Sequence, residues 1–187
     1  MEQSGATVDV QSPWYAVRLF GMKLMEVEEY FQQKCFETFV PRQWQITEDK
    51  DGKPKRLLRP VVHNLLFVKK NGDESIMRKA VEESSHKISV IRKMADSQAY
   101  YEIPAKQMKE FRLMCNPDVS LREYLSEQEA RMKPGAEVLV KFGPLKGLSG
   151  RLVRISKKYY LLKEVPGMGV ALKVSRWCCV PMNEDNS

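Results

Sequence analysis

Side chains that could perform catalysis or bind a metal are scarce in this sequence of 187 residues. It holds only two histidines, His63 and His86, and neither lies at zinc-ligand spacing from a cysteine. The four cysteines contain no Cys-x-x-Cys pair; they are Cys35, Cys115, Cys178 and Cys179. Catalysis would need a nucleophile beside a base, or a cluster of metal ligands. The sequence therefore predicts no enzyme, no metal site and no cofactor, and four reduced thiols whose default role is packing.

Basic side chains are the other group that could bind a partner, because Lys and Arg attract polyanions. The formal net charge is +7. Residues 134–181 carry 9 Lys and Arg against 2 Asp and Glu, whereas residues 1–115 carry 19 against 16. The positive excess is therefore concentrated in the smaller C-terminal part of the chain.

Glycines at close spacing mark residues 134–155, PGAEVLVKFGPLKGLSGRLVRI. A short alternating run ends at Gly143-Pro144, and a second begins directly after Gly150. Gly147 and Gly150 are expected to allow positive φ angles and close backbone approach where a small barrel bends.

The chain begins without a basic-then-apolar segment, and no apolar run approaches the roughly 18 residues that span a bilayer. We therefore expect a soluble monomer in the cytoplasm, with no membrane partner.

Hydrophobic spacing predicts a first domain over residues 12–115. Leu24, Val27, Phe31 and Cys35 fall on one face of a helix. The apolar run at 61–68 suits a central strand. The full expectation is strands at 14–20, 38–47, 57–70, 88–92 and 100–103, a hairpin turn at Asp51-Gly52, and helices at 22–35, 74–83 and 104–114. This order implies an α+β sandwich with an antiparallel sheet.

The segment 116–133 is predicted to be a linker with a short helix from Leu121 to Met132, capped by Ser120 and Glu123. Residues 134–182 are then expected to form an SH3-like barrel of five short strands. The last three strands are placed at 159–163, 170–174 and 177–180. We expect the two domains to be stable independently of each other.

Several motifs together resemble bacterial NusG-family proteins, in which an NGN domain precedes a KOW domain. WYAVRLFG at 14–21 is similar to the opening strand, and FVPRQ at 39–43 to the following one. IPAKQMKEF at 103–111 resembles the last NGN helix, and 134–155 resembles the KOW motif. VVHNLLFV at 61–68 departs from the usual FPGY[VL]FV pattern. This departure suggests a specialised paralogue of the RfaH or capsule-locus (UpxY) kind.

The resemblance implies a transcription elongation factor that modulates pausing and termination, including antitermination. Its NGN domain would bind the clamp helices of RNA polymerase through an apolar patch. By position the candidates for that patch are Trp14, Val62, Leu65 and Phe67. The alternative for each is core packing, because a strand has two faces.

The resemblance also implies two further partners. In specialised members the second helix and the strand after it touch the non-template DNA strand, which here points to Arg78, Lys79, His86, Lys87 and Arg92. Glu82 and Glu83 nearby also fit a simple solvated face. The KOW loops would dock a ribosomal small-subunit protein or Rho through Leu145, Leu148, Val165 and Met168, unless these residues pack inside the barrel.

A different function fits the same residues. In an RNA-binding or ribosome-associated KOW protein, the cations of the barrel would grip RNA directly; they are Lys141, Lys146, Arg151, Arg154, Lys157 and Lys158. Steeply salt-dependent RNA affinity would favour this alternative, and an apolar patch on the first domain would favour polymerase.

Overall fold

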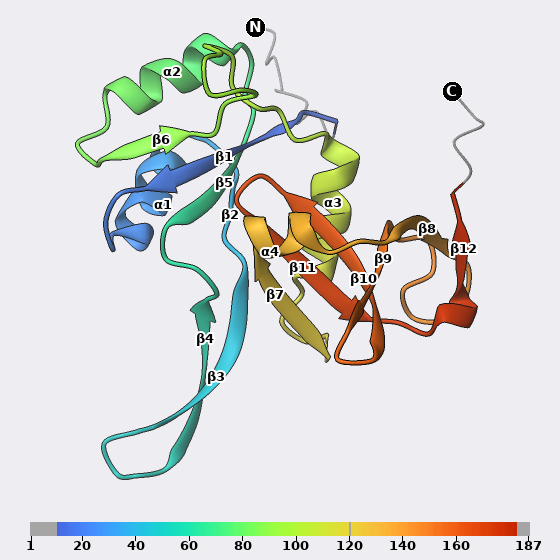
Figure 1. Ribbon diagram of the computed structural model, residues 1–187. Coiled ribbons are helices and arrows are strands. Elements are labelled where there is room, and N and C mark those ends of the chain that lie inside the picture. The colour runs from blue at the N-terminus through green and yellow to red at the C-terminus, as the bar shows by residue number, and fades with distance from the viewer. Residues whose placement is uncertain (1–10, 120, 183–187) are drawn as a thin grey trace, which may run out of the picture.

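The computed structural model describes residues 11–119 and 121–182, and its N-terminal part is built on a four-stranded antiparallel sheet (Figure 1). The strands are β1 (Trp14–Leu19), β2 (Thr38–Phe39), β5 (Leu65–Lys69) and β6 (Ile88–Val90), in the order β2-β5-β1-β6. The predicted central strand is therefore confirmed from Leu65 onward, whereas residues 61–64 precede it as a loop. The strand expected at 100–103 is reduced to single bridges at Tyr100 and Ile103.

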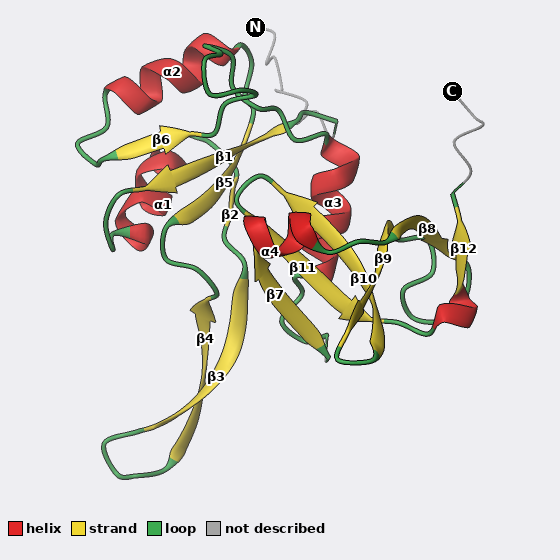
Figure 2. Ribbon diagram, in the orientation of Figure 1, coloured by secondary structure: helices red, strands yellow, loops and turns green. Residues whose placement is uncertain are grey.

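Helices cover both faces of this sheet (Figure 2). α1 (Leu24–Gln33) and α2 (Glu74–Glu82) pack on the face that carries Tyr15, Val17 and Leu66. α3 (Ala105–Met114) packs on the opposite face. The buried residues of α1 are Leu24, Val27 and Phe31, which confirms the predicted apolar stripe except for Cys35, an exposed residue with φ 63° just after the helix.

A two-stranded ribbon projects from this layer (Figure 1). It consists of β3 (Arg42–Glu48) and β4 (Pro54–Pro60), joined by a turn at the predicted Asp51-Gly52, where Gly52 has φ 73°. The single strand expected at 38–47 is divided between β2 and β3 at Pro41. Proline has no N–H to donate to a strand ladder, which explains the break.

The C-terminal part is a six-stranded antiparallel sheet in the order β12-β8-β9-β10-β11-β7. Its strands are β7 (Arg122–Ser126), β8 (Ala136–Val140), β9 (Ser149–Ile155), β10 (Lys158–Val165), β11 (Met168–Lys173) and β12 (Cys179–Pro181). β12 follows a 3₁₀ turn, Arg176–Cys178, so the strand expected at 177–180 begins later than predicted. Within the described residues β7 and β12 are opposite edges, so the sheet is open and the expected closed five-stranded barrel is not observed.

The predicted helix from Leu121 to Met132 is wrong in its first half. Residues 122–126 form β7, which pairs with β11, and only α4 (Glu127–Met132) is helical. The capping box lies at Ser126 and Glu129, each of which bonds the backbone N–H of the other. Ser120 lies outside the described residues, and Glu123 belongs to the strand. Pairing with β11 outweighs the local helix preference, as tertiary context often does.

The glycine prediction is correct for Gly147, which has φ 91°, but Gly150 is not among the glycines with positive φ. Gly150 instead permits close approach, because an added Cβ would lie 2.6 Å from the carbonyl oxygen of Leu162. Gly150→Ala is therefore expected to lower the free energy of unfolding by about 1–3 kcal/mol through overpacking.

Thermal denaturation of this variant beside Gly147→Ala would separate the two causes. The Cβ of Gly147→Ala meets open space, so only backbone strain of about 1 kcal/mol is expected there. A Gly150→Ala protein as stable as wild type would contradict the inferred backbone contact.

None of the helices in the described residues is long and apolar enough to cross a membrane. The described residues also contain no group of three His, Cys, Asp or Glu side chains that could hold a metal ion.

Candidate functional site

Three of the four residues predicted to bind polymerase lie together on the α3 face of the N-terminal sheet. The register pairs Ala16 with Phe67 and Arg18 with Leu65, so these side chains and Trp14 project to the same side. The ring of Phe67 lies 5.5 Å from that of Phe111 on α3. Trp14, Leu65 and Phe67 are buried, and Val62, half-buried, packs at the edge of the same cluster.

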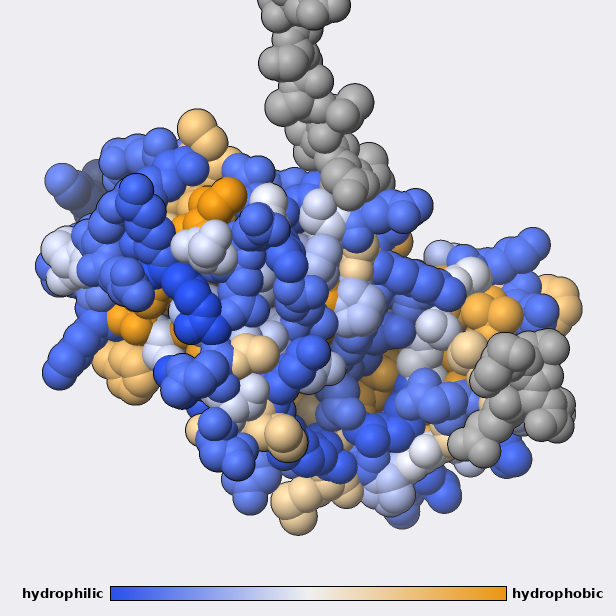
Figure 3. Space-filling model, turned by 90° about the horizontal axis from the view of Figure 1, so that it is seen from above, coloured by the Kyte–Doolittle hydropathy of each residue, from blue (hydrophilic) through white to orange (hydrophobic). Residues whose placement is uncertain are grey.

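The C-terminal sheet covers this face, so the chain itself supplies the burial (Figure 1). The apolar cluster joins the N-terminal residues above to residues of the C-terminal sheet; the latter are Val138, Val140, Leu161, Val165, Met168, Val170 and Leu172. The turn between β10 and β11 rests on Leu65, since a Cβ at Gly167 would lie 2.8 Å from its methyl carbons. One face of the molecule shows mainly hydrophilic side chains, with apolar ones in small separate groups (Figure 3).

A buried ion pair connects the two parts inside this contact. Lys163 Nζ of β10 donates to Glu110 Oε2 of α3 at 2.5 Å, and the Ser149 hydroxyl donates to the same oxygen at 3.0 Å. Only about a tenth of either charged side chain is exposed. Charges buried to this degree are stable only while paired. The pair therefore fixes the register of β10 against α3.

Two polar contacts flank the buried pair. Gln107 Nε2 on α3 donates to the carbonyl oxygen of Glu164 at 2.7 Å. Arg18 on β1 forms an exposed ion pair with Glu127 on α4 at 2.9 Å. Exposed pairs contribute little stability, so apolar burial and the Glu110 pair dominate the contact.

The residues predicted to dock a ribosomal protein or Rho are not gathered on one exposed surface. Val165 and Met168 lie in the β10–β11 hairpin and are buried in the shared cluster. Leu145 and Leu148 are half-buried and pack at its margin. In this arrangement a partner could reach Val165 and Met168 only after the two parts separate.

The C-terminal part exposes other apolar side chains that sequence reasoning did not select. Trp177 is 92% exposed, and Phe142 and Leu121 are also exposed. Phe142 and Leu121 line a pocket of about 310 Å³ that Pro144 and Leu145 share. The Gly143-Pro144 turn beside Phe142 was the available signal for its exposure.

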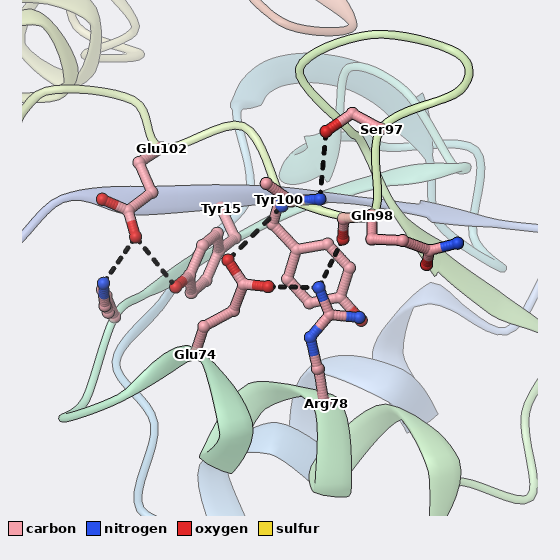
Figure 4. Close-up of polar contacts among 9 residues, drawn as sticks. Tyr15, Glu74, Arg78, Ser97, Gln98, Tyr100 and Glu102 are labelled. Carbon is pink, nitrogen blue, oxygen red and sulfur yellow. Dashed lines mark hydrogen bonds and ion pairs between the residues drawn. The ribbon is translucent and has the colours of Figure 1, made fainter.

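The predicted DNA-binding cations lie on and after α2, and Arg78 has structural partners there (Figure 4). Its guanidinium bonds Glu74 and the carbonyl oxygen of Gln98, and it stacks 4.5 Å from the ring of Tyr100. Arg78 therefore anchors the loop before Tyr100. Lys79 lies 3.8 Å from Glu83, a weak exposed pair.

The remaining residues predicted to bind DNA are His86, Lys87 and Arg92. His86 lies 6.4 Å from the ring of Tyr30. Lys87 immediately precedes β6, and Arg92 forms a backbone bridge to Tyr100 beyond its end. Lys87 and Arg92 thus flank β6, an edge strand of the sheet, and a DNA role for these residues stays a prediction.

Beside Arg78, a second set of polar contacts holds β1 to the chain before α3 (Figure 4). Glu102 accepts hydrogen bonds from the hydroxyl of Tyr15 at 3.3 Å and from Lys70 at 2.5 Å. Burial, and the negative charge of Glu102, raise the pKa of Tyr15 above its usual value, so its hydroxyl stays protonated and can donate. This network stabilises the scaffold rather than performing chemistry.

An open groove of about 1080 Å³ runs along the outer side of α3, next to the covered face. Trp14, Phe39 and Leu113 supply apolar surface, and the guanidinium of Arg112 stacks on Trp14 and Phe39 at 5.0 and 5.4 Å. Arg112 also pairs with Glu37 at 3.0 Å. One side of the predicted polymerase-binding surface is therefore open to solvent along this groove.

The cysteines differ in exposure, so packing is the role of Cys115 but not of Cys35, which is exposed. Burial raises the pKa of Cys115 to about 12, because the thiolate would be desolvated beside Tyr124. At pH 8 we expect Cys115 to react with a thiol reagent at least a hundredfold more slowly than Cys35. Mass spectrometry of timed alkylation would measure this, and equal rates at both residues would contradict the burial of Cys115.

Comparison with known proteins bears on the N-terminal part. A family model described as "Transcription termination factor nusG" matches residues 12–112, which is more than half of the chain. A comparison with curated proteins gave no match. The matched region holds the four-stranded sheet, the three helices around it and the covered apolar face. The chain therefore belongs to the NusG family, whose members are non-enzymatic factors of transcription elongation and termination.

Proposed function

We propose that this protein is a transcription elongation factor that binds RNA polymerase through the α3 face of its N-terminal part. The single observation that carries the proposal is the apolar surface around Leu65 and Phe67, which packs against residues of the C-terminal sheet in one buried cluster. A large exposed apolar face marks a docking surface on a soluble protein. The clamp helices of polymerase are the partner that membership of the family suggests for it.

On this proposal, polymerase and the C-terminal sheet compete for one surface. Polymerase can only bind the fraction of molecules in which the two parts have separated. Bound across the cleft, the factor would hold mobile parts of polymerase together and alter pausing and termination without making or breaking a covalent bond. Opposition to termination, as in RfaH-like or UpxY-type paralogues, is the form of activity that we propose.

Separation would also expose the C-terminal surface. We propose that residues 134–182 act as a KOW domain that recruits a ribosomal small-subunit protein or Rho, with Val165 and Met168 available only in the separated state. The division into 12–115, 116–133 and 134–182 is part of this proposal. The non-template strand would run past the cations that follow α2.

A titration of core polymerase tests the proposal. We expect a chain ending at residue 119 to bind polymerase more tightly than the full chain, because its α3 face is uncovered. The full chain and the shortened chain should also be titrated with single-stranded RNA over a range of salt. If the shortened chain does not bind polymerase, and only the full chain binds RNA with a steep salt dependence, the RNA-binding alternative is correct. The 9 cations against 2 carboxylates in residues 134–181 are the observation that supports that alternative.

A further inference from the structure

Among the described residues the β3–β4 ribbon has no neighbouring strand on either side, because β3 and β4 pair with each other over seven residues and with no other described strand. The ribbon extends away from the rest of the protein (Figure 1). Its base is fixed by Arg42, which pairs with Glu28 of α1 at 2.6 Å. The segment 42–60 carries 6 Lys and Arg against 3 Asp and Glu. A projecting, positively charged ribbon is therefore presented by the N-terminal part, outside the contact between the two sheets.

The register divides the ribbon into two chemically different faces. Trp44 lies opposite Leu58, and Ile46 lies opposite Arg56; we call this the apolar face. The guanidinium of Arg56 stacks 4.4 Å from the ring of Trp44. The indole N–H of Trp44 donates to Asp118 at 3.0 Å, which ties the apolar face to the loop after α3.

The other face, which we call the polar face, points away from that loop because side chains alternate along a strand. Its three cross-strand pairs are Gln43 with Arg59, Gln45 with Leu57, and Thr47 with Lys55. It therefore presents two amides, a hydroxyl and two cations, and no carboxylate. Among the described residues neither Lys55 nor Arg59 forms an ion pair.

We propose that the polar face of the ribbon binds double-stranded DNA in the major groove. A two-stranded antiparallel ribbon fits the width of that groove in B-form DNA. Seven residues of strand extend on the order of 20 Å, enough to follow the groove across several base pairs. The residue types match the groove chemistry: Gln amides pair with adenine edges, and Lys and Arg reach guanine or phosphate.

Charge and shape favour duplex DNA over other partners. A protein partner would be expected to use apolar anchors, but those of the ribbon lie on the opposite face, and Leu57 is only half-exposed. Duplex RNA offers a deep and narrow major groove that side chains do not read. The proposal therefore predicts a preference between two duplexes of equal charge.

This inference rests on the proposed function only for the source of the DNA, which would be the duplex next to the transcribing polymerase. Binding to free duplex does not require polymerase, so the two proposals can fail separately. The probe is a labelled DNA duplex of about two helical turns, compared with an RNA duplex of the same sequence. Both are titrated with the full chain over a range of salt that begins at about 50 mM.

The main variant is Lys55→Ala with Arg59→Ala. We expect it to weaken DNA binding about tenfold and to reduce the slope of log K against log salt by about 2, one for each cation. The matched control is Lys173→Ala with Arg176→Ala, which removes one Lys and one Arg from exposed positions on β11 and in the 3₁₀ turn before β12 and should leave DNA affinity unchanged. Gln45→Ala should lower affinity severalfold without changing the salt slope. Equal melting temperatures would show that the variants remain folded.

Several outcomes would overturn the proposal. Wild-type protein that does not bind DNA at low salt would do so, as would a control pair that loses as much affinity as the ribbon pair. Equal affinity for the RNA duplex would show general attraction to phosphate and no use of the DNA groove. Loss of polymerase binding in the ribbon variant, with DNA binding intact, would assign the ribbon to a protein partner. Failure of the shortened chain to bind polymerase would count against the proposed function alone.

Discussion

Replacing Lys163 with alanine is expected to separate the two parts of the chain and to raise affinity for RNA polymerase. The substitution leaves Glu110 buried without its cation, and loss of one member of a buried pair costs about 3 kcal/mol or more. The cost applies only while the C-terminal sheet covers α3, so the ratio of separated to closed molecules should rise on the order of a hundredfold. Polymerase affinity should increase until the separated form predominates.

Two measurements check this expectation. Titration with core polymerase should show the gain in affinity, and alkylation of Cys115 should become faster because Tyr124 of the C-terminal part no longer covers it. The matched control is Lys173→Ala, which removes an exposed lysine from the neighbouring strand β11. A Lys163→Ala protein with wild-type polymerase affinity and wild-type thiol protection would show that the ion pair does not hold the two parts together.

Replacing Phe67 with alanine is expected to have the largest effect on stability, a loss of about 4 kcal/mol in the free energy of unfolding. Its fully buried ring contacts Phe111 at 5.5 Å and Phe39 at 6.2 Å, so truncation leaves a cavity within the N-terminal part itself. Urea denaturation would measure the loss. Phe142→Ala removes the same atoms from a side chain that is 67% exposed and should change stability by less than about 0.5 kcal/mol.

The Phe67→Ala substitution also tests binding to polymerase. If Phe67 also contacts polymerase, its truncation should weaken binding about thirtyfold, or about 2 kcal/mol, in molecules that remain folded. Leu65→Ala is the better variant for testing binding, because Leu65 contacts the C-terminal turn at Gly167 and is therefore uncovered when the two parts separate. Unchanged affinity of both variants for polymerase would exclude this face as the polymerase-binding surface.

Local patterns predicted the elements of the N-terminal part well. The i, i+3, i+7 spacing from Leu24 identified α1, and Pro104 correctly marked the start of α3. Such signals depend on neighbours within a few residues, so they can be recognised in the sequence without knowledge of tertiary contacts. The division of the expected 38–47 strand at Pro41 could also have been read from the missing N–H of proline.

Long-range contacts account for the differences. β7 is a strand because it pairs with β11, which follows some forty residues later. The sequence around Tyr124 gives no indication of that partner. Likewise, Trp14, Leu65 and Phe67 lie on one face of the N-terminal sheet. Their burial under the C-terminal sheet depends on Met168 and Leu161, which lie about a hundred residues away. Periodicity shows that a strand has an apolar face, but it does not identify what covers that face.

The short connection between the two parts has a consequence for the strength of this competition. Only Cys115 to Leu121 separate the end of α3 from the start of β7, and seven residues reach at most about 25 Å. On the proposed function, the C-terminal sheet would therefore be a tethered competitor whose effective concentration near α3 is in the millimolar range. Polymerase at a much lower concentration than this could displace the sheet only by binding the α3 face more tightly than the sheet does. Lengthening the segment after Pro117 would dilute the competitor, so linker length sets the threshold at which polymerase displaces the C-terminal sheet.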